Sequence, residues 1–188
     1  MSSIVLYGKV VNDKSRIIPV EIDISGSLIS ISHQHSQVHQ GTYFTVSHLF
    51  SAVSAGADAE LLVRFPAGVT GHMVMKVSAG ADATVQLFEA PTASADGTAI
   101  TPINHNRQST NTADSTAFYG PTITDDGTRL HSEFLPGGGI LAPGAILTVN
   151  TEQFVLAAGS DYLFRVTNDG AGAENISIDT SYYEVPLG

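Results

Sequence analysis

Three histidines lie within a short stretch, at His33, His35 and His39. If the stretch is a strand, side chains two positions apart share a face, so these imidazoles could bind one zinc ion. No Asp or Glu occurs between residues 33 and 39 to orient a ring nitrogen, as metal-binding histidines usually require. We therefore interpret the stretch as a polar linker, keep metal binding as the alternative, and expect no bound metal or cofactor.

Asp58 and Asp82 are a second pair of candidate ligands, for calcium. Each lies in a copy of Ser-Ala-Gly-Ala-Asp-Ala, at 54–59 and 78–83, and a looser copy occupies 157–162. Glycine permits positive φ, and an Asp side chain can bond its own backbone two residues on, so each copy predicts a turn that begins a strand. Calcium needs six or more oxygens and the EF-hand spacing is absent, so the turn is the favoured interpretation.

The chain lacks the familiar catalytic patterns. It contains neither a G-x-S-x-G elbow nor an H-E-x-x-H zinc motif, and no pair of carboxylates stands out. The Pro-Gly-Gly-Gly segment at 136–139 lacks the lysine and the following helix of a phosphate loop. We therefore expect no catalytic residues and no enzymatic activity.

The composition favours one β-rich domain without disulfides. The chain has 188 residues, of which 43% are hydrophobic and 14% charged, and it has no cysteine. Its net charge of −10 argues against a nucleic-acid partner, which needs clustered lysine and arginine. The N-terminus lacks a signal-peptide pattern, and no apolar run reaches membrane-spanning length. We expect synthesis in the cytoplasm and no membrane partner.

Residues 1–40 differ from the rest. Residues 1–20 carry Lys9, Lys14 and Arg16 against Asp13 alone, a net charge of +2 in an otherwise acidic chain. Chance over a short window explains this, and so does a cationic arm that docks on an acidic partner. Alternation over 18–24, a Ser-Gly-Ser turn and an apolar return at 28–31 predict a hairpin. The domains predicted are an arm over 1–40 and a β domain over 41–188.

Alternating apolar residues predict the strands of that β domain. They occur over 42–53, 61–65, 73–77 and 85–88, then at 116–119, at 121–124 leading through a turn at 125–127 into a hairpin with 128–135, and at 146–149, 153–156, 162–168 and 176–184. Side chains 162, 164 and 166 point one way, and 176, 178, 180 and 182 fit either a facing or a neighbouring strand. So many short strands predict an all-β sandwich with a jelly-roll layout.

The stretch 90–115 is polar and lacks periodicity. It predicts a long surface loop, and loops of this length are often functional. Its His105 and Arg107 are candidate ligand contacts, with solvated side chains as the alternative.

The same part of the chain resembles a known family. Residues 85–91 read Val-Gln-Leu-Phe-Glu-Ala-Pro, and residues 95–107 read Ala-Asp-Gly-Thr-Ala-Ile-Thr-Pro-Ile-Asn-His-Asn-Arg. They resemble small virion proteins of tailed bacteriophages, which pair a Leu-Tyr/Phe-Glu strand end with an SADGTA-TP-N-NR loop. Similar segments at 121–124, 136–138 and 162–168 extend the resemblance over roughly residues 40–185.

The resemblance implies a capsid decoration, or cement, protein. Such a protein is made in the host bacterial cytoplasm, binds the major capsid protein on the outer capsid surface as a homotrimer, and stabilises the shell. The alternatives are a tail, baseplate or head-fibre component, or a module for host glycans, although the absence of Trp weakens a sugar site. The expected capsid contacts lie in the arm: Lys9, Lys14, Arg16, Ile18, Val20, Ile22 and Ile24.

Overall fold

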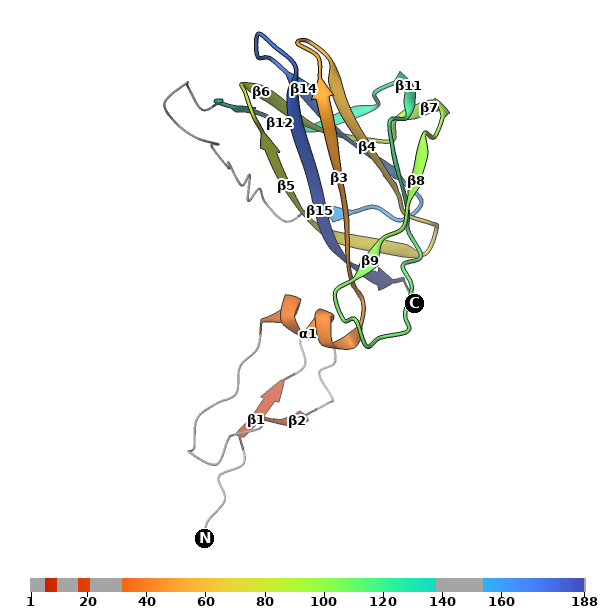
Figure 1. The fold of residues 1–188 in the computed structure, drawn as a ribbon. Coiled ribbons are helices and arrows are strands. Elements are labelled where there is room, and N and C mark those ends of the chain that lie inside the picture. The colour runs from red at the N-terminus through yellow and green to blue at the C-terminus, as the bar shows by residue number, and fades with distance from the viewer. Residues whose placement is uncertain (1–5, 10–16, 21–31, 138–153, 188) are drawn as a thin grey trace. The chain divides into compact units, whose positions relative to one another are not determined.

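The structure is a computed structural model and describes residues 6–9, 17–20, 32–137 and 154–187 (Figure 1). By its contacts the chain divides into two units, residues 1–36 and residues 37–188. The sequence-based boundary at 40/41 stays a prediction. Within the described residues the helix is α1 (His33–Gln40), which is far too short to cross a membrane.

In the first unit, β1 (Leu6–Lys9) pairs antiparallel with β2 (Ile17–Val20). The predicted hairpin joined 18–24 to 28–31, whereas the structure pairs Ile18 with Gly8 and Val20 with Leu6. The return segment 28–31 lies outside the described residues. Pro19 is accommodated because both strands of a two-stranded sheet are edge strands.

Helix α1 corrects the prediction of a polar linker at 33–39. The Ser32 hydroxyl accepts a hydrogen bond from the His35 amide at 3.2 Å, which caps the helix start. At its end Gly41 has φ of 71°, and the amides of Gly41 and Thr42 donate to the carbonyls of residues 38 and 37. This is a Schellman ending, in which glycine takes the left-handed position.

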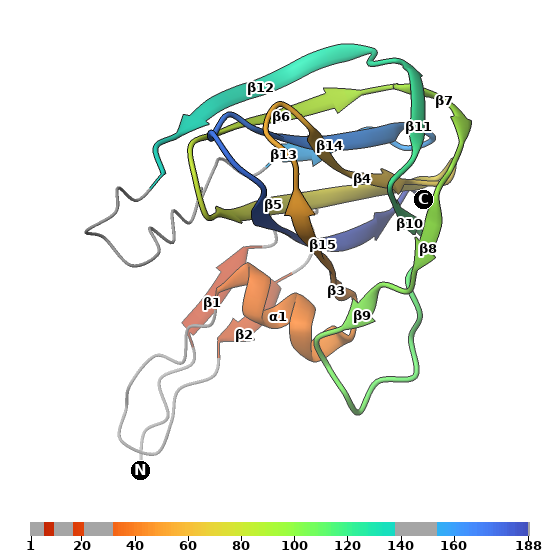
Figure 2. The same ribbon diagram turned by 45° about the horizontal axis from the view of Figure 1, so that its top comes forward.

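The second unit is a sandwich of two antiparallel sheets (Figure 1). One sheet has the order β13-β5-β15-β3-β9, and the other has the order β12-β6-β14-β4-β10-β8. A separate two-stranded sheet pairs β7 with β11, and Figures 1 and 2 show these two strands together beside the six-stranded sheet. The strands of the unit are β3 (Tyr43–Val53), β4 (Asp58–Arg64), β5 (Val69–Ala79), β6 (Ala83–Glu89), β7 (Thr92–Ala95), β8 (Thr98–Ile100), β9 (Ile103–Asn104), β10 (Thr116–Tyr119), β11 (Thr122–Asp125), β12 (Thr128–Leu135), β13 (Phe154–Leu156), β14 (Asp161–Asn168) and β15 (Glu174–Pro186).

The strand order is that of a jelly roll. The eight strands β3, β4, β5, β6, β12, β13, β14 and β15 alternate between sheets in four-stranded orders β13-β5-β15-β3 and β12-β6-β14-β4. This confirms the predicted all-β sandwich. Residues 90–127 form an insertion between β6 and β12, and this insertion supplies β7 to β11.

The repeated Ala-Gly-x-Asp turns are the corners of the sandwich. They carry the chain from β3 to β4, from β5 to β6 and from β13 to β14, each time from the five-stranded to the six-stranded sheet. Gly56 and Gly159 have φ of 73° and 72°, as the turn prediction requires. Gly80 in the middle copy does not have positive φ, so that corner uses the same sequence in another conformation.

Two predictions about strand layout were wrong. Residues 90–115 are not an irregular loop, because β7, β8 and β9 lie within them. The turn at 125–127 exists, with Gly127 at φ of 75°, but it is not a hairpin turn. Its flanking strands β11 and β12 pair with β7 and β6 instead. The strand predicted at 146–149 lies outside the described residues.

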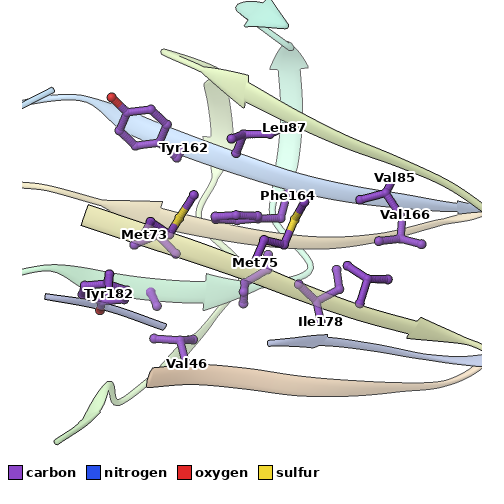
Figure 3. Packing of buried hydrophobic residues seen from close by; sticks show 14 of the residues in the cluster. Val46, Met73, Met75, Val85, Leu87, Tyr162, Phe164, Val166, Ile178 and Tyr182 are labelled. Carbon is purple, nitrogen blue, oxygen red and sulfur yellow. The ribbon is translucent and has the colours of Figure 1, made fainter. Parts of the chain in front are cut away.

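The core fills the space between the sheets (Figure 3). Alternate side chains of β5, β15 and β3 meet alternate side chains of β4, β6 and β14, so residues 162–166 face residues 176–182 across the core, which is one of the two arrangements that the sequence allowed. Burial of this apolar area supplies most of the stabilisation, at about 25 cal/mol per Å² removed from water. Its largest fully buried members are Tyr162, Tyr182, Phe164, Leu61, Met73, Met75, Leu87, Leu156, Ile176 and Ile178.

Candidate interaction surface

The arm residues expected to contact a capsid divide into two groups. Lys9 lies in β1, and Ile18 and Val20 lie in β2. The others, Lys14, Arg16, Ile22 and Ile24, lie outside the described residues. Their role as partner contacts stays a prediction.

His105 and Arg107 are exposed in the loop that follows β9. The His105 amide donates to the Tyr43 carbonyl at 2.9 Å, and the His105 ring meets the Tyr43 ring edge-on, with centroids 4.7 Å apart. The loop is therefore anchored to β3 at this point. Contact of either side chain with a ligand stays a prediction.

The histidine stretch lies on a helix, so spacing along a strand no longer brings its rings together. Positions 35 and 39 are one helical turn apart and share a face, whereas position 33 points elsewhere. In the described part of the chain no group of three or more His, Cys, Asp or Glu is placed to hold a metal ion.

Several residues of the loop at 95–107 fix the conformation of the loop. Asp96 and Gly97 form the turn between β7 and β8. The buried Asn104 amide donates to the carbonyls of Gly41 at 2.8 Å and Asn111 at 3.1 Å, and thereby ties the loop to the start of β3. The motif thus encodes the conformation of this insertion.

Arg64 clamps the first half of the insertion onto β4. Its guanidinium donates two hydrogen bonds to Asp96, at 2.7 and 2.8 Å, and one to Asp161 at 2.7 Å. The plane lies over the Phe118 ring, 5.4 Å from its centroid. The hydrogen bonds from Arg64 hold the pKa of the Asp96 carboxyl below its usual range.

Arg165 forms the matching clamp on β14. It donates to Asp126 at 2.7 and 2.8 Å and to Glu60 at 2.7 Å, and it lies 5.3 Å from the Phe88 centroid. The hydrogen bonds to Arg165 lower the pKa of Asp126. Burial raises the pKa of Glu60, although Arg165 opposes that shift.

The two clamps are related by a local two-fold arrangement about the β4–β14 pair. Arg64 lies opposite Asp161, and Arg165 lies opposite Glu60 in the ladder. The amides of Gly120 and Ala90 donate to the carbonyls of Glu60 and Asp161, at 3.0 and 2.8 Å. Each arginine therefore joins two segments that are far apart in sequence.

A repeat in the sequence corresponds to this two-fold arrangement. The predictions made from the sequence do not include it. Residues 88–98 and 118–128 both read Phe-x-Ala/Gly-Pro-Thr-x-x-x-Asp-Gly-Thr. The copies are intertwined, because β8 after the first copy pairs with β10, while β12 after the second pairs with β6. In each copy a Cβ on the turn glycine, Gly97 or Gly127, would collide with backbone carbonyls of the other copy.

The outer face of the five-stranded sheet is rich in hydroxyls and hollowed. A depression of about 390 Å³ is lined by Tyr43, Thr45, Val74, Lys76, His105, Asp179 and Ser181. A neighbouring hollow of about 260 Å³ shares Lys76 and Asp179. Both charged side chains therefore border two adjoining spaces on this sheet face.

The two ends of the sandwich differ in character. Four carboxylates gather around the turns β3–β4, β5–β6 and β14–β15: Asp58, Asp82, Asp169 and Glu174. Backbone hydrogen bonds join the three turns, for example the one from the Asp169 amide to the Asp82 carbonyl at 2.9 Å. The other end, where β3 begins and β15 ends, exposes Ile103, Val185 and Leu187 at 45%, 36% and 57%.

Comparison with known proteins assigns no family to this chain. No protein-family model matches it, and no curated protein is similar to it at a significant level.

Proposed function

We propose that this chain is a structural virion protein of a tailed bacteriophage, which binds the outer capsid surface as a homotrimer and stabilises the shell. The role comes from the resemblance of the 85–107 segment to small virion proteins. The supporting structural feature is that this segment builds the clamped insertion on the jelly roll, so the resemblance concerns a folded element and not an isolated string of residues.

The apolar end of the sandwich is the observation that carries the docking part of the proposal. Ile103, Val185 and Leu187 are exposed at the end where the chain leaves α1 and enters β3. Single exposed apolar residues are ordinary, but three of them at one end of the sandwich form a candidate contact surface. A repeating shell lets weak contacts add through several protomers.

The end of the sandwich that carries four carboxylates is suited to face solvent and not the shell. Asp58, Asp82, Asp169 and Glu174 carry like charges on turns that protrude from the sheets. Burying four carboxylates against a partner without matched cations costs free energy, so this end should face solvent. The orientation that follows has the start of β3 toward the shell and the Ala-Gly-x-Asp corners outward.

The experiment compares binding to purified shells that lack this protein. Deletion of residues 1–32, and separately the triple change Ile103→Ser, Val185→Ser and Leu187→Ser, should each lower shell occupancy at least tenfold in co-sedimentation. Leu49→Ser is the matched control, because Leu49 is 58% exposed on the same sheet and nearer the acidic end. Its occupancy should equal that of the wild type.

Unchanged occupancy for both variants would refute the proposed docking end. A monomeric mass for the purified protein would refute the trimer. Imaging of labelled virions would overturn the capsid assignment if the label lay on the tail or baseplate.

A further inference from the structure

We propose that the depression on the outer face of the five-stranded sheet binds a neutral saccharide, with Asp179 and Lys76 as its principal polar contacts. Its two charged contacts lie within β15 and β5, whereas Tyr43 and His105 on its rim border the start of β3 and the loop that carries Arg107. It would give the virion surface an affinity for sugars in addition to its structural role.

The first observation is that the Asp179 carboxylate accepts no short hydrogen bond from the described residues. Thr45 Oγ1 and Ser181 Oγ lie 3.5 Å from Asp179 Oδ1. Each hydroxyl has a single hydrogen, and shorter bonds use both: Thr45 donates to the Thr180 carbonyl at 3.2 Å, and Ser181 donates to Thr45 at 3.1 Å. The Asp179 carboxylate is therefore an acceptor that can receive a hydrogen bond from an incoming hydroxyl.

The second observation is the position of Lys76. Lys76 and Asp179 are direct partners in the β5–β15 ladder, on one face of the sheet. Despite this register, their charged atoms do not come within ion-pair distance of each other. A molecule between them can accept from the ammonium and donate to the carboxylate at once.

Neighbouring hydroxyls of a sugar ring meet this requirement. Each hydroxyl can donate and accept, so one donates to Asp179 while the next accepts from Lys76. The opposite charges of the two side chains offset each other, which favours a neutral ligand over an anion or a cation. The depression of about 390 Å³ is within the size range of small-molecule sites.

The rim offers a ring for the apolar side of the sugar. His105 is exposed at the edge of the depression, and its edge-to-face contact with Tyr43, at 89°, fixes the plane of the imidazole. An aromatic ring next to hydrogen-bonding groups supplies apolar contact for ring C–H groups. His105 thus takes part in this site from the first position of the loop that follows β9.

The test is an NMR titration of the full chain with glucose, galactose, mannose and N-acetylglucosamine, each up to about 100 mM. We expect at least one sugar to give saturable shifts at amides of β3, β5 and β15, with a Kd on the order of 1–10 mM. Asp179→Asn and Lys76→Met should each weaken this binding at least tenfold. Arg107→Ala, the matched control in the neighbouring loop, should stay within twofold of the wild type.

Three results would overturn the proposal. They are no saturable shift with any of the four sugars, an unchanged Kd in Asp179→Asn, and shifts confined to the loop around Arg107. Unchanged amide shifts of core residues in the other sheet, such as Leu87, show that each variant is folded. Shell binding is measured on the same variants and should be unaffected, so this proposal and the capsid proposal fail separately.

Discussion

Replacing Arg165 by methionine should destabilise the sandwich by about 3 kcal/mol. The change removes the cation between Glu60 and Asp126 but keeps an unbranched apolar stem. The side chains of Arg165 and Glu60 are each 15% exposed, whereas Asp126 is 44% exposed. Solvent screening limits the Asp126 pair to at most about 1 kcal/mol. Leaving the largely buried Glu60 carboxylate without its cation costs about 2–3 kcal/mol.

Urea unfolding at pH 7.5 measures this loss, with circular dichroism as the signal. For a chain of this size, a loss of about 3 kcal/mol lowers Tm by roughly 6–12 °C. Arg129→Met is the matched control, because Arg129 is exposed on β12. It should change the free energy of unfolding by no more than about 0.5 kcal/mol.

The pH dependence identifies the source of the loss. Burial raises the pKa of Glu60 in the native state, so the native state binds its proton more readily than the unfolded chain does. Stability assigned to Glu60 therefore rises as pH falls through that raised pKa. Removal of Arg165 takes away the hydrogen bond and the charge that oppose this shift, so the pKa rises further.

The deficit of Arg165→Met should therefore shrink between about pH 8 and pH 5. The Asp126 pKa is lowered, so its contribution in the wild type is present above its unfolded pKa and is lost only at more acidic pH. A deficit that stays constant from pH 8 to pH 5 would refute the view that an unpaired Glu60 carboxylate causes it.

The remaining predictions concern the insertion. Gly97→Ala and Gly127→Ala each place a Cβ against backbone carbonyls at positive φ, and should each cost about 2–4 kcal/mol in urea unfolding. Gly120→Ala should cost only about 1 kcal/mol, because its space is open and Ala90 holds the related position with φ of 55°; equal losses at all three glycines would contradict the steric argument. Asn104→Ala removes the three side-chain hydrogen bonds of Asn104, with Gly41, Asn111 and Asn106, and should cost about 1–3 kcal/mol, with faster hydrogen exchange over 104–111; unchanged exchange would contradict its anchoring role.

The jelly-roll strands were predictable because their side chains alternate clearly. In β5, Met73, Met75 and Val77 are buried and the intervening residues are more exposed, which is the period that the sequence displays. The same signal put 162–166 and 176–182 on facing or neighbouring strands, and the sheet order decides that they face each other. Large apolar residues on one face of a strand are stable only when that face is buried. The alternation therefore fixes which side of each strand lies in the core.

The insertion was missed because its strands carry small and polar residues. β7 reads Thr-Ala-Ser-Ala, and none of its residues is buried. It is held by hydrogen bonding to β11 and by the Asp96 clamp, and neither produces an apolar period. Helix α1 has no buried residue either, so only its caps, Ser32 and Gly41, marked it in the sequence.

The arginine clamps could have been predicted by comparing two strands of the chain with each other, although no known motif marks them. Glu60 and Arg64 in β4 have the same four-residue spacing as Asp161 and Arg165 in β14. Residues four apart on a strand share a face, so each strand presents an acid and a base to one side. Pairing the strands antiparallel then brings each arginine opposite the acid of the other strand.

Some residues of the loop motif hold the fold, and others are exposed and free to contact a partner. Asp96, Gly97 and Asn104 are committed to the clamp, the turn and the anchor, so changing them alters the fold before it alters recognition. Ile103 and Arg107 lie in the same segment and are exposed. Since a strand alternates its faces, the anchor at 104 turns 103 outward whichever residue it carries. Residues 103 and 107 can therefore be changed without altering the scaffold of the insertion.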